Sequence, residues 1–232
     1  ALPENSILLL DTNNINTLMK SIESMGVCEE LCSMILEDES LMMMNISKDD
    51  IASIKRIPEF DKIKYPNKYA GMSIYPVVDY ELGSVGMGAV AIIELEDDSI
   101  ANFIPTLMDQ VDKYKSFEVD KVDLVGRDVW MITSIQEEMN KMDSMEMFSF
   151  EINTFRKLYV CVTSHHLTIC TEPDGLAQII ESIDGDYPDK SLSGNETFIS
   201  IKNKIKHDDA QMNMVVMLEN LTDSLMQMDS SG

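Results

Sequence analysis

The chain has 232 residues, with 41 acidic against 18 basic side chains and a formal net charge of −23. Charged residues make up 25% and hydrophobic residues 44%, which is ordinary for a globular protein. Nucleic acids and anionic membranes both attract clustered Lys and Arg, so this charge balance excludes both as partners. The hydrophobic content is enough to build a core without disulfides or a metal.

The first predicted element is a short apolar strand over residues 7–10. A polar run at residues 11–14 follows, and apolar side chains then recur with helical spacing as far as Ile22. Polar side chains at such a junction can cap the N–H groups that begin the helix. The same strand, polar cluster and helix recur further along the chain, which leaves duplication and convergence as open alternatives; the copies span residues 90–107, 167–183 and 214–226.

Between these units the pattern predicts antiparallel hairpins. Strands over residues 72–80 and 87–95 flank a turn with glycine, and Gly126-Arg127 favours a type II′ turn between two further strands, 119–125 and 128–133. Later strands are predicted at residues 148–152, 157–162 and 167–170, and additional helices at 28–36, 48–57 and 196–206.

Consecutive hairpins favour an antiparallel meander over a parallel sheet. The predicted fold is therefore α+β, a meander sheet with helices packed mainly on one face. We expect a single domain over residues 1–232, with a subdomain boundary near 58–70, where Pro58 and Pro66 indicate a connecting loop.

The four cysteines form two close pairs, Cys28/Cys32 and Cys161/Cys170. Two disulfides and four reduced, mostly buried thiols are both compatible with this spacing, and the second is favoured because the chain is long enough to fold without disulfides. The first residue is Ala1, which fits either a shortened chain or cleavage of a signal peptide behind a small residue.

Methionine is the most unusual feature of the composition, with 19 residues. Met139, Met142, Met145 and Met147 form a spaced run in an otherwise polar segment, and thioethers are soft ligands suited to Cu(I). The alternative is that methionine fills the core, as it does in many proteins. The run is therefore a candidate copper site.

A second candidate metal site is the glycine turn after residue 183. Asp184, Asp186 and Asp189 offer hard oxygen ligands of the kind that Ca²⁺ prefers, although the full EF-hand loop and its final glutamate are missing. A solvated loop after a helix is the stronger interpretation, so we expect no cofactor beyond weakly bound Ca²⁺.

No sequence motif for catalysis is found in the chain. It has no HExxH, CxxC, Gly-x-Ser-x-Gly or phosphate-binding glycine loop. The adjacent pair His165 and His166 is poorly placed to chelate one metal, and cysteines within apolar strands, such as Cys161 and Cys170, are usually inert. The chain is therefore expected not to be an enzyme.

Three dispersed motifs resemble a family of exported bacterial proteins of unknown function. They are the start Leu2-Pro3-Glu4 before a short strand, the paired strands that lead into Thr171-Glu172-Pro173-Asp174, and the helix that begins near Ser191-Leu192 and includes Phe198. The resemblance implies an α+β fold and an extracytoplasmic location, either periplasmic, at the cell surface or secreted. It implies no catalytic residues.

Together these features predict a non-enzymatic extracytoplasmic binding, structural or assembly protein with an acidic surface. Its expected partner is another protein or a second copy of itself. The alternative is a periplasmic metal-handling protein that uses the methionine-rich segment 139–147.

Overall fold

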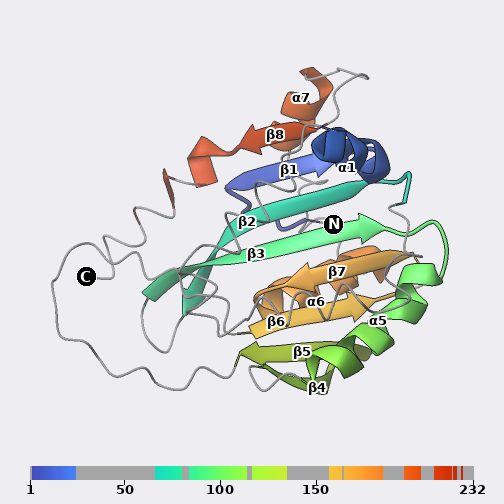
Figure 1. Ribbon diagram of the computed structural model, residues 1–232. Coiled ribbons are helices and arrows are strands. Elements are labelled where there is room, and N and C mark those ends of the chain that lie inside the picture. Colours follow the sequence, from blue (N-terminus) through green and yellow to red (C-terminus); the bar gives the residue numbers. More distant parts are fainter. Residues whose placement is uncertain are drawn as a thin grey trace, which may run out of the picture.

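The computed structural model describes residues 2–24, 66–79, 84–113, 117–134, 157–163, 165–184, 196–204, 212–220, 222–223 and 226. Figure 1 shows these residues as a twisted sheet with helices on its two faces. In chain order, the elements are β1 (Leu8–Thr12), α1 (Ile15–Ser24), β2 (Ala70–Asp79), β3 (Ser84–Glu94), α5 (Ser99–Val111), β4 (Phe117–Leu124), β5 (Arg127–Ser134), β6 (Lys157–Val162), β7 (His166–Cys170), α6 (Pro173–Asp184), α7 (Glu196–Lys204) and β8 (Asn213–Val216).

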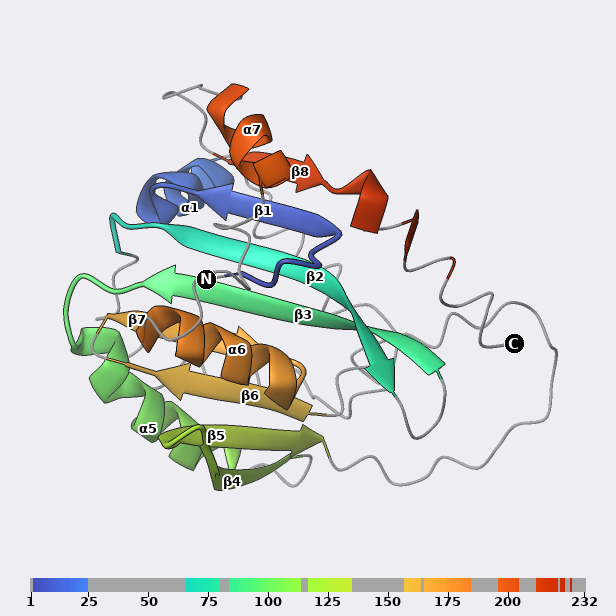
Figure 2. The same ribbon diagram turned by 180° about the vertical axis from the view of Figure 1, so that it is seen from behind.

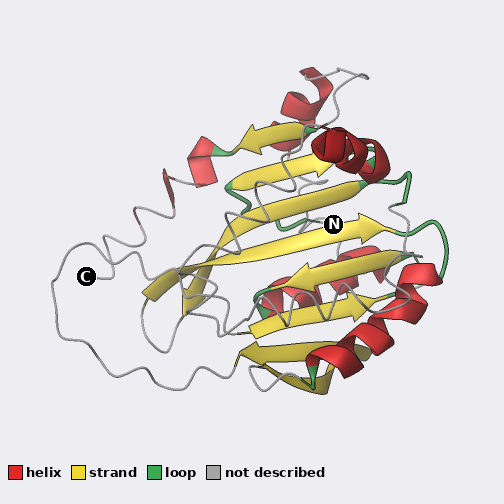
Figure 3. Ribbon diagram, viewed as in Figure 1, coloured by secondary structure: helices red, strands yellow, loops and turns green. Residues whose placement is uncertain are grey.

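The sheet has eight strands in the order β4-β5-β6-β7-β3-β2-β1-β8. Every neighbouring pair is antiparallel, so the predicted α+β class with an antiparallel sheet is confirmed. Strands that follow one another in the chain are neighbours from β2 to β3 and again from β4 to β7. The two long connections contain helices: α5 lies between β3 and the edge strand β4, and α6 and α7 lie between β7 and the opposite edge strand β8 (Figure 3). β1 and β2 lie on either side of the predicted boundary near residues 58–70, and they pair with each other.

Helices pack on both faces of the sheet. α5 covers Val160 and Leu167, and α6 covers Tyr159 and Cys170 on the opposite face. Figure 1 shows α5 in front of the sheet, and Figure 2, from behind, shows α6 in front. α5 and α6 therefore lie on opposite faces, and the expectation of helices mainly on one face is not confirmed. Both faces of β6 carry apolar residues, so each face needs its own cover.

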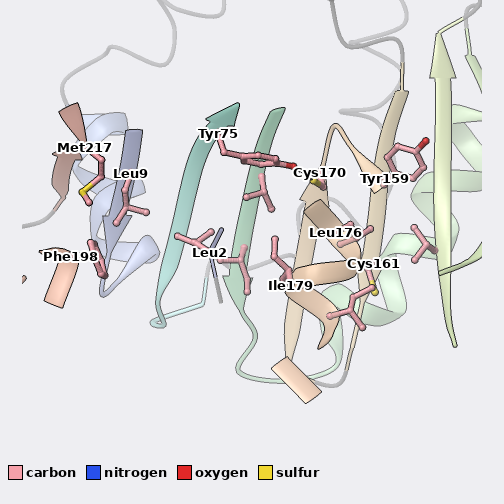
Figure 4. Close-up of a cluster of buried hydrophobic side chains, with 14 of the residues drawn as sticks. Leu2, Leu9, Tyr75, Tyr159, Cys161, Cys170, Leu176, Ile179, Phe198 and Met217 are labelled. Atoms are coloured by element: carbon pink, nitrogen blue, oxygen red, sulfur yellow. Dashed lines mark hydrogen bonds between the residues drawn. The ribbon is translucent and has the colours of Figure 1, made fainter. Parts of the chain in front are cut away.

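The larger core lies between the sheet and the helices α6 and α7. Leu176 and Ile179 of α6 pack against the centre of the sheet, and Phe198 of α7 lies with Leu9 and Met217 nearer to the β8 edge (Figure 4). Leu176 and Ile179 are 0% and 1% exposed. Burying a side chain of this size contributes about 1.5–3 kcal/mol, so this face supplies much of the stability.

The smaller core lies beneath α5. Ile104 and Met108 of the helix contact Val160 and Leu167, with Trp130 at the border of the cluster. Lys121 places its ammonium 5.1 Å from the centre of the Trp130 ring, across the β4–β5 pair. α5 therefore covers the half of this face that is nearest to β4.

The turn between β4 and β5 differs from the predicted type II′ turn at Gly126-Arg127. Leu124 pairs with Arg127, so the two loop residues are Val125 and Gly126. Both have positive φ, 47° and 75°, which is the pattern of a type I′ turn. Val125 is a β-branched residue in a left-handed conformation, which is a strained position.

Polar side chains at the strand-to-helix junctions do not all cap helices. At α1 the prediction is confirmed, because Asn14 Oδ1 accepts a hydrogen bond of 2.9 Å from the Thr17 N–H. At the start of α6, Thr171 Oγ1 instead accepts a hydrogen bond of 2.9 Å from the Ala89 N–H, which ties β7 to β3. None of the helices in the described ranges combines the length and apolar character needed to cross a membrane.

Candidate interaction surface

On the α5 face of the sheet, the half formed by β2, β1 and β8 carries two rows of apolar side chains. Strand register fixes the rows: Leu10 pairs with Met72 on one side and Met214 on the other, and Leu8 pairs in the same way with Ile74 and Val216. Directly paired residues project to the same face. We call these six side chains the β8 surface.

Three side chains of the β8 surface are exposed and the other three are partly buried, whereas the reverse side of the same strands is buried. Met214 is 64% exposed, Val216 45% and Met72 41%. On the reverse face, Leu9 is 2% exposed and Val215 is 8%. The strands alternate between faces along the backbone, so the difference reflects the cover that each face receives and not the composition of the strands.

More apolar side chains extend the β8 surface at both ends of β8. Met212 precedes the strand with 52% exposure, and Leu218 follows it with 68%. Figures 1 and 2 show α5 at the far side of the sheet, beside β4 to β7, so it does not reach these residues. A contiguous apolar area of this kind on a protein surface is typical of a binding site.

β8 is held firmly in the sheet although it has only 4 residues. The Met217 N–H donates to the Ile7 carbonyl over 2.8 Å, and the Asn220 amide donates to the Ser6 carbonyl over 2.8 Å. At the other end, Asn213 Nδ2 donates to the carboxylate of Asp11 over 2.8 Å. The exposed side chains of β8 therefore stand on an ordered backbone.

The charge next to β8 is negative. Asp11 is 6% exposed, and its carboxylate faces Asn213. Burial, and secondly the Asp11 charge, raises the pKa of the Tyr69 hydroxyl well above its usual range. The Tyr69 hydroxyl therefore stays neutral, and it does not compensate the negative charge of Asp11.

A second cluster of polar groups is buried and involves sulfur. Tyr75 Oη lies 3.2 Å from Cys170 Sγ, at the start of α6. Burial raises the pKa of the Cys170 thiol and of the Tyr75 hydroxyl, so both groups are neutral at physiological pH. Cys161 and Cys170 form no disulfide and are 2% and 1% exposed, which is typical of structural cysteines and not of nucleophiles.

The two adjacent histidines do not form a joint site. His165 is exposed in the turn before β7, whereas His166 is partly buried and pairs with Glu94 in the sheet. Burial lowers the pKa of His166, so its imidazole is held in the neutral form. His166 Nδ1 is buried and has no hydrogen-bond partner among the residues that the structure describes.

The predicted metal ligands fall largely outside the described residues. Met139, Met142, Met145 and Met147 all lie there, as do Asp186 and Asp189, and Asp184 is the last residue of α6. Within the described ranges, His, Cys, Asp and Glu side chains form no group of three that could hold a metal ion. Both metal sites therefore stay predictions.

The β8 surface was not among the sites that sequence patterns indicated. Met214 and Met217 fall in the same predicted strand–helix unit, residues 214–226, yet only Met217 is buried, with 5% exposure. Apolar and polar residues do not alternate in Asn213-Met214-Val215-Val216, so the sequence does not show which face of this strand meets solvent. The one sequence feature that could have indicated this surface is a short strand that has no charged residue and no alternation of polar residues.

Comparison of the chain with protein-family models, with curated proteins and with solved structures found no match. The resemblance to exported bacterial proteins thus stays a prediction from short motifs.

Proposed function

We propose that this chain is a non-enzymatic binding or assembly protein that uses the β8 surface to hold a protein partner. The observation that carries the proposal is the exposure of Met214, Val216 and Met72 on a face whose neighbouring half is covered by α5. Keeping apolar side chains in water costs about 25 cal/mol for each Å² that a partner could bury. A partner that covers these rows therefore gains affinity from the hydrophobic effect.

Methionine suits such a surface. Its side chain is unbranched and polarisable, so it adapts to partners of different shape. Two of the three exposed residues in the rows are methionines, Met72 and Met214. The surface therefore offers a large apolar contact area whose side chains can adjust to the shape of a partner.

The chemistry of the described titratable groups supports a function without catalysis. The thiols of Cys161 and Cys170 are buried, and the raised pKa of Cys170 opposes formation of a thiolate. Catalytic groups instead need access to a substrate and a pKa near the working pH.

The proposed location is extracytoplasmic, on the basis of the acidic composition and of the resemblance of the Leu2-Pro3-Glu4 start and the Thr171-Glu172-Pro173-Asp174 junction to exported proteins. The location is tested by fractionating cells of the source with an antibody against the folded chain. Recovery with the cytoplasmic marker would contradict it.

Duplication of a strand–helix unit is also proposed, on the strand order. β3 leads through α5 to an edge strand beyond three others, and β7 leads through α6 and α7 to the other edge in the same way. A two-fold axis normal to the sheet would keep both helices on one face, whereas α5 and α6 lie on opposite faces. The proposal therefore concerns the path between the strands and not the placement of the helices.

Site-specific photocrosslinking in cells of the source tests the proposed function. A benzophenone amino acid replaces Met214 in one variant and Asp120, an exposed residue of the β4 edge, in the matched control. We expect one dominant crosslinked protein at position 214 and none at position 120. Equal labelling from both positions, or none, would reject the β8 surface as the binding site.

A further inference from the structure

We infer that the partner binds as an added strand along β8, which is an edge strand of the described sheet, and that it is an extended apolar segment flanked by Lys or Arg. This inference rests on the proposed function and specifies its partner. Strand addition supplies affinity through main-chain hydrogen bonds and specificity through alternate side chains. Three properties of β8 support it: backbone direction, the chemistry of the two sheet edges, and charge.

The backbone direction follows from one hydrogen bond. Met217 donates its N–H to the Ile7 carbonyl over 2.8 Å, so Met217 faces β1. In an antiparallel pair, successive residues alternate between facing the partner strand and facing away from it. Val215 therefore faces β1, and the N–H and C=O groups of Met214 and Val216 point to the outer edge.

The two edges of the sheet differ in their protection against added strands. β4, at one edge, has 8 residues, and four of them are charged: Glu118, Asp120, Lys121 and Asp123. Charged side chains on edge strands prevent pairing with other chains. β8, at the opposite edge, is Asn-Met-Val-Val and has no charged residue. The residues of β4 therefore disfavour strand addition, whereas the four residues of β8 do not.

The charge of the chain specifies the partner. Exposed acids follow β8 at Glu219 and Asp223, and Glu4 lies beside Asn220, which donates to its carbonyl. α1 and α7, which flank β1 and β8 in both views, contribute the exposed cations Lys20 and Lys204 (Figures 1 and 2). The whole chain carries −23, so a second copy would be repelled, whereas a basic partner would be attracted.

The size of the partner segment follows from strand geometry. β8 offers 4 residues, and at about 3.4 Å per residue they span roughly 14 Å. A pairing segment of about five residues fits this edge, and its flanking cations then reach the acids beyond Leu218. The apolar side chains of the added strand would lie beside Met214 and Val216.

The test uses a defined probe, the fluorescein-labelled peptide Lys-Lys-Val-Thr-Val-Thr-Val-Lys-Lys, with binding followed by fluorescence anisotropy. One control peptide has Glu in place of every Lys, and another has N-methyl groups on alternate core residues, which removes their N–H donors. We expect each control to bind at least tenfold more weakly than the probe, and the affinity for the probe to fall with added salt. Equal binding of the N-methylated peptide would overturn strand addition.

The matching protein variant is Met214→Pro. Position 214 faces the outer edge, so proline removes a donor that β1 does not use and the fold should persist, as checked by circular dichroism. We expect at least a tenfold loss of probe affinity, whereas Lys121→Pro on β4 should leave the affinity unchanged. Lys121 is the matched position because the Val119 N–H donates to the Asp112 carboxylate and not to β5, so residues 119 and 121 face the outer edge of β4. The peptide controls decide the question even if Met214→Pro fails to fold.

Failure of this inference can be told from failure of the proposed function. If photocrosslinking at position 214 succeeds while the N-methylated peptide binds as well as the probe, the β8 surface binds a partner without strand addition. If light scattering shows a dimer that Met214→Pro abolishes, the added strand comes from a second copy, and the basic partner is rejected.

Discussion

The hydroxyl of Tyr75 lies 3.2 Å from the sulfur of Cys170, and this contact joins the centre of the sheet to α6. Tyr75 is on β2 and Cys170 ends β7, with β3 between them. The ring fits because residues 88 and 175 are glycines: a Cβ at Gly88 would lie 2.7 Å from Tyr75 Cζ, and a Cβ at Gly175 would overlap the hydroxyl. Because Gly88 and Gly175 have no side chain, α6 can lie close to the sheet at this point.

Substitution of Gly175 by alanine should destabilise the protein by about 1–3 kcal/mol, because the new methyl group overpacks against Tyr75. Urea unfolding measures the change. Gly86→Ala is the matched control, since its Cβ would meet only the Val77 carbonyl, at 4.0 Å. Adding Tyr75→Phe to Gly175→Ala should recover part of the loss by removing the overlapping oxygen. Strict additivity of the two changes would contradict the contact.

Stability should fall as the pH rises above about 9. Burial raises the pKa of the Tyr75, Cys170 and Tyr159 side chains. Their contribution is complete below the pKa values of the unfolded chain and is lost above them, because only the unfolded state then releases these protons. Urea midpoints at pH 8, 9 and 10 measure the effect. Tyr75→Phe should flatten this decline, and an unchanged slope would argue against a neutral buried phenol.

Val125→Asn should stabilise the protein by about 1 kcal/mol. Val125 has φ of 47° and is exposed, so its side chain adds strain to the turn and little packing. Asn-Gly is the favoured pair for a type I′ turn. The thermal midpoint measures the gain. In the converse variant, Gly126→Ala should destabilise through its φ of 75° alone, because nothing lies within 4 Å of the added Cβ.

Salt should raise the thermal midpoint. The chain carries 41 acids and a net charge of −23, so self-repulsion opposes the compact state at neutral pH. We expect the midpoint to increase from 10 mM to 150 mM sodium chloride, and an unchanged midpoint would contradict this account. At matched ionic strength, a further rise with Ca²⁺ that Asp186→Asn removes would support the predicted calcium site.

Copper binding by the methionine run is tested separately, because the run lies outside the described residues. If Met139, Met142, Met145 and Met147 bind Cu(I), replacing all four by leucine should weaken binding at least tenfold in a competition titration. Met72→Leu is the control. Equal affinities of the wild type and the fourfold variant would reject the metal-handling alternative.

Local features of the fold could be predicted from the sequence. The pairs β2–β3, β4–β5 and β6–β7, and the helices α1, α5 and α6, all correspond to predicted segments within a few residues. These features depend on contacts between residues close in the chain: alternation along a strand, glycine in a turn, and a capping side chain such as Asn14. The predicted helices at 28–36 and 48–57 and the strand at 148–152 lie outside the described residues.

The candidate site could not be predicted, because it depends on the strand order. β8 pairs with β1, which lies about 200 residues earlier, and this pairing makes β8 an edge strand. Met214 and Met217 are the same residue type, and only the strand register shows that Met214 lies on the exposed face and Met217 on the buried face. Thus the sequence by itself determined the elements and the charge, through local backbone and side-chain preferences. Only the tertiary structure decided that α5 covers half of its face and leaves Met214 exposed, because long-range packing determines which apolar surface is removed from water.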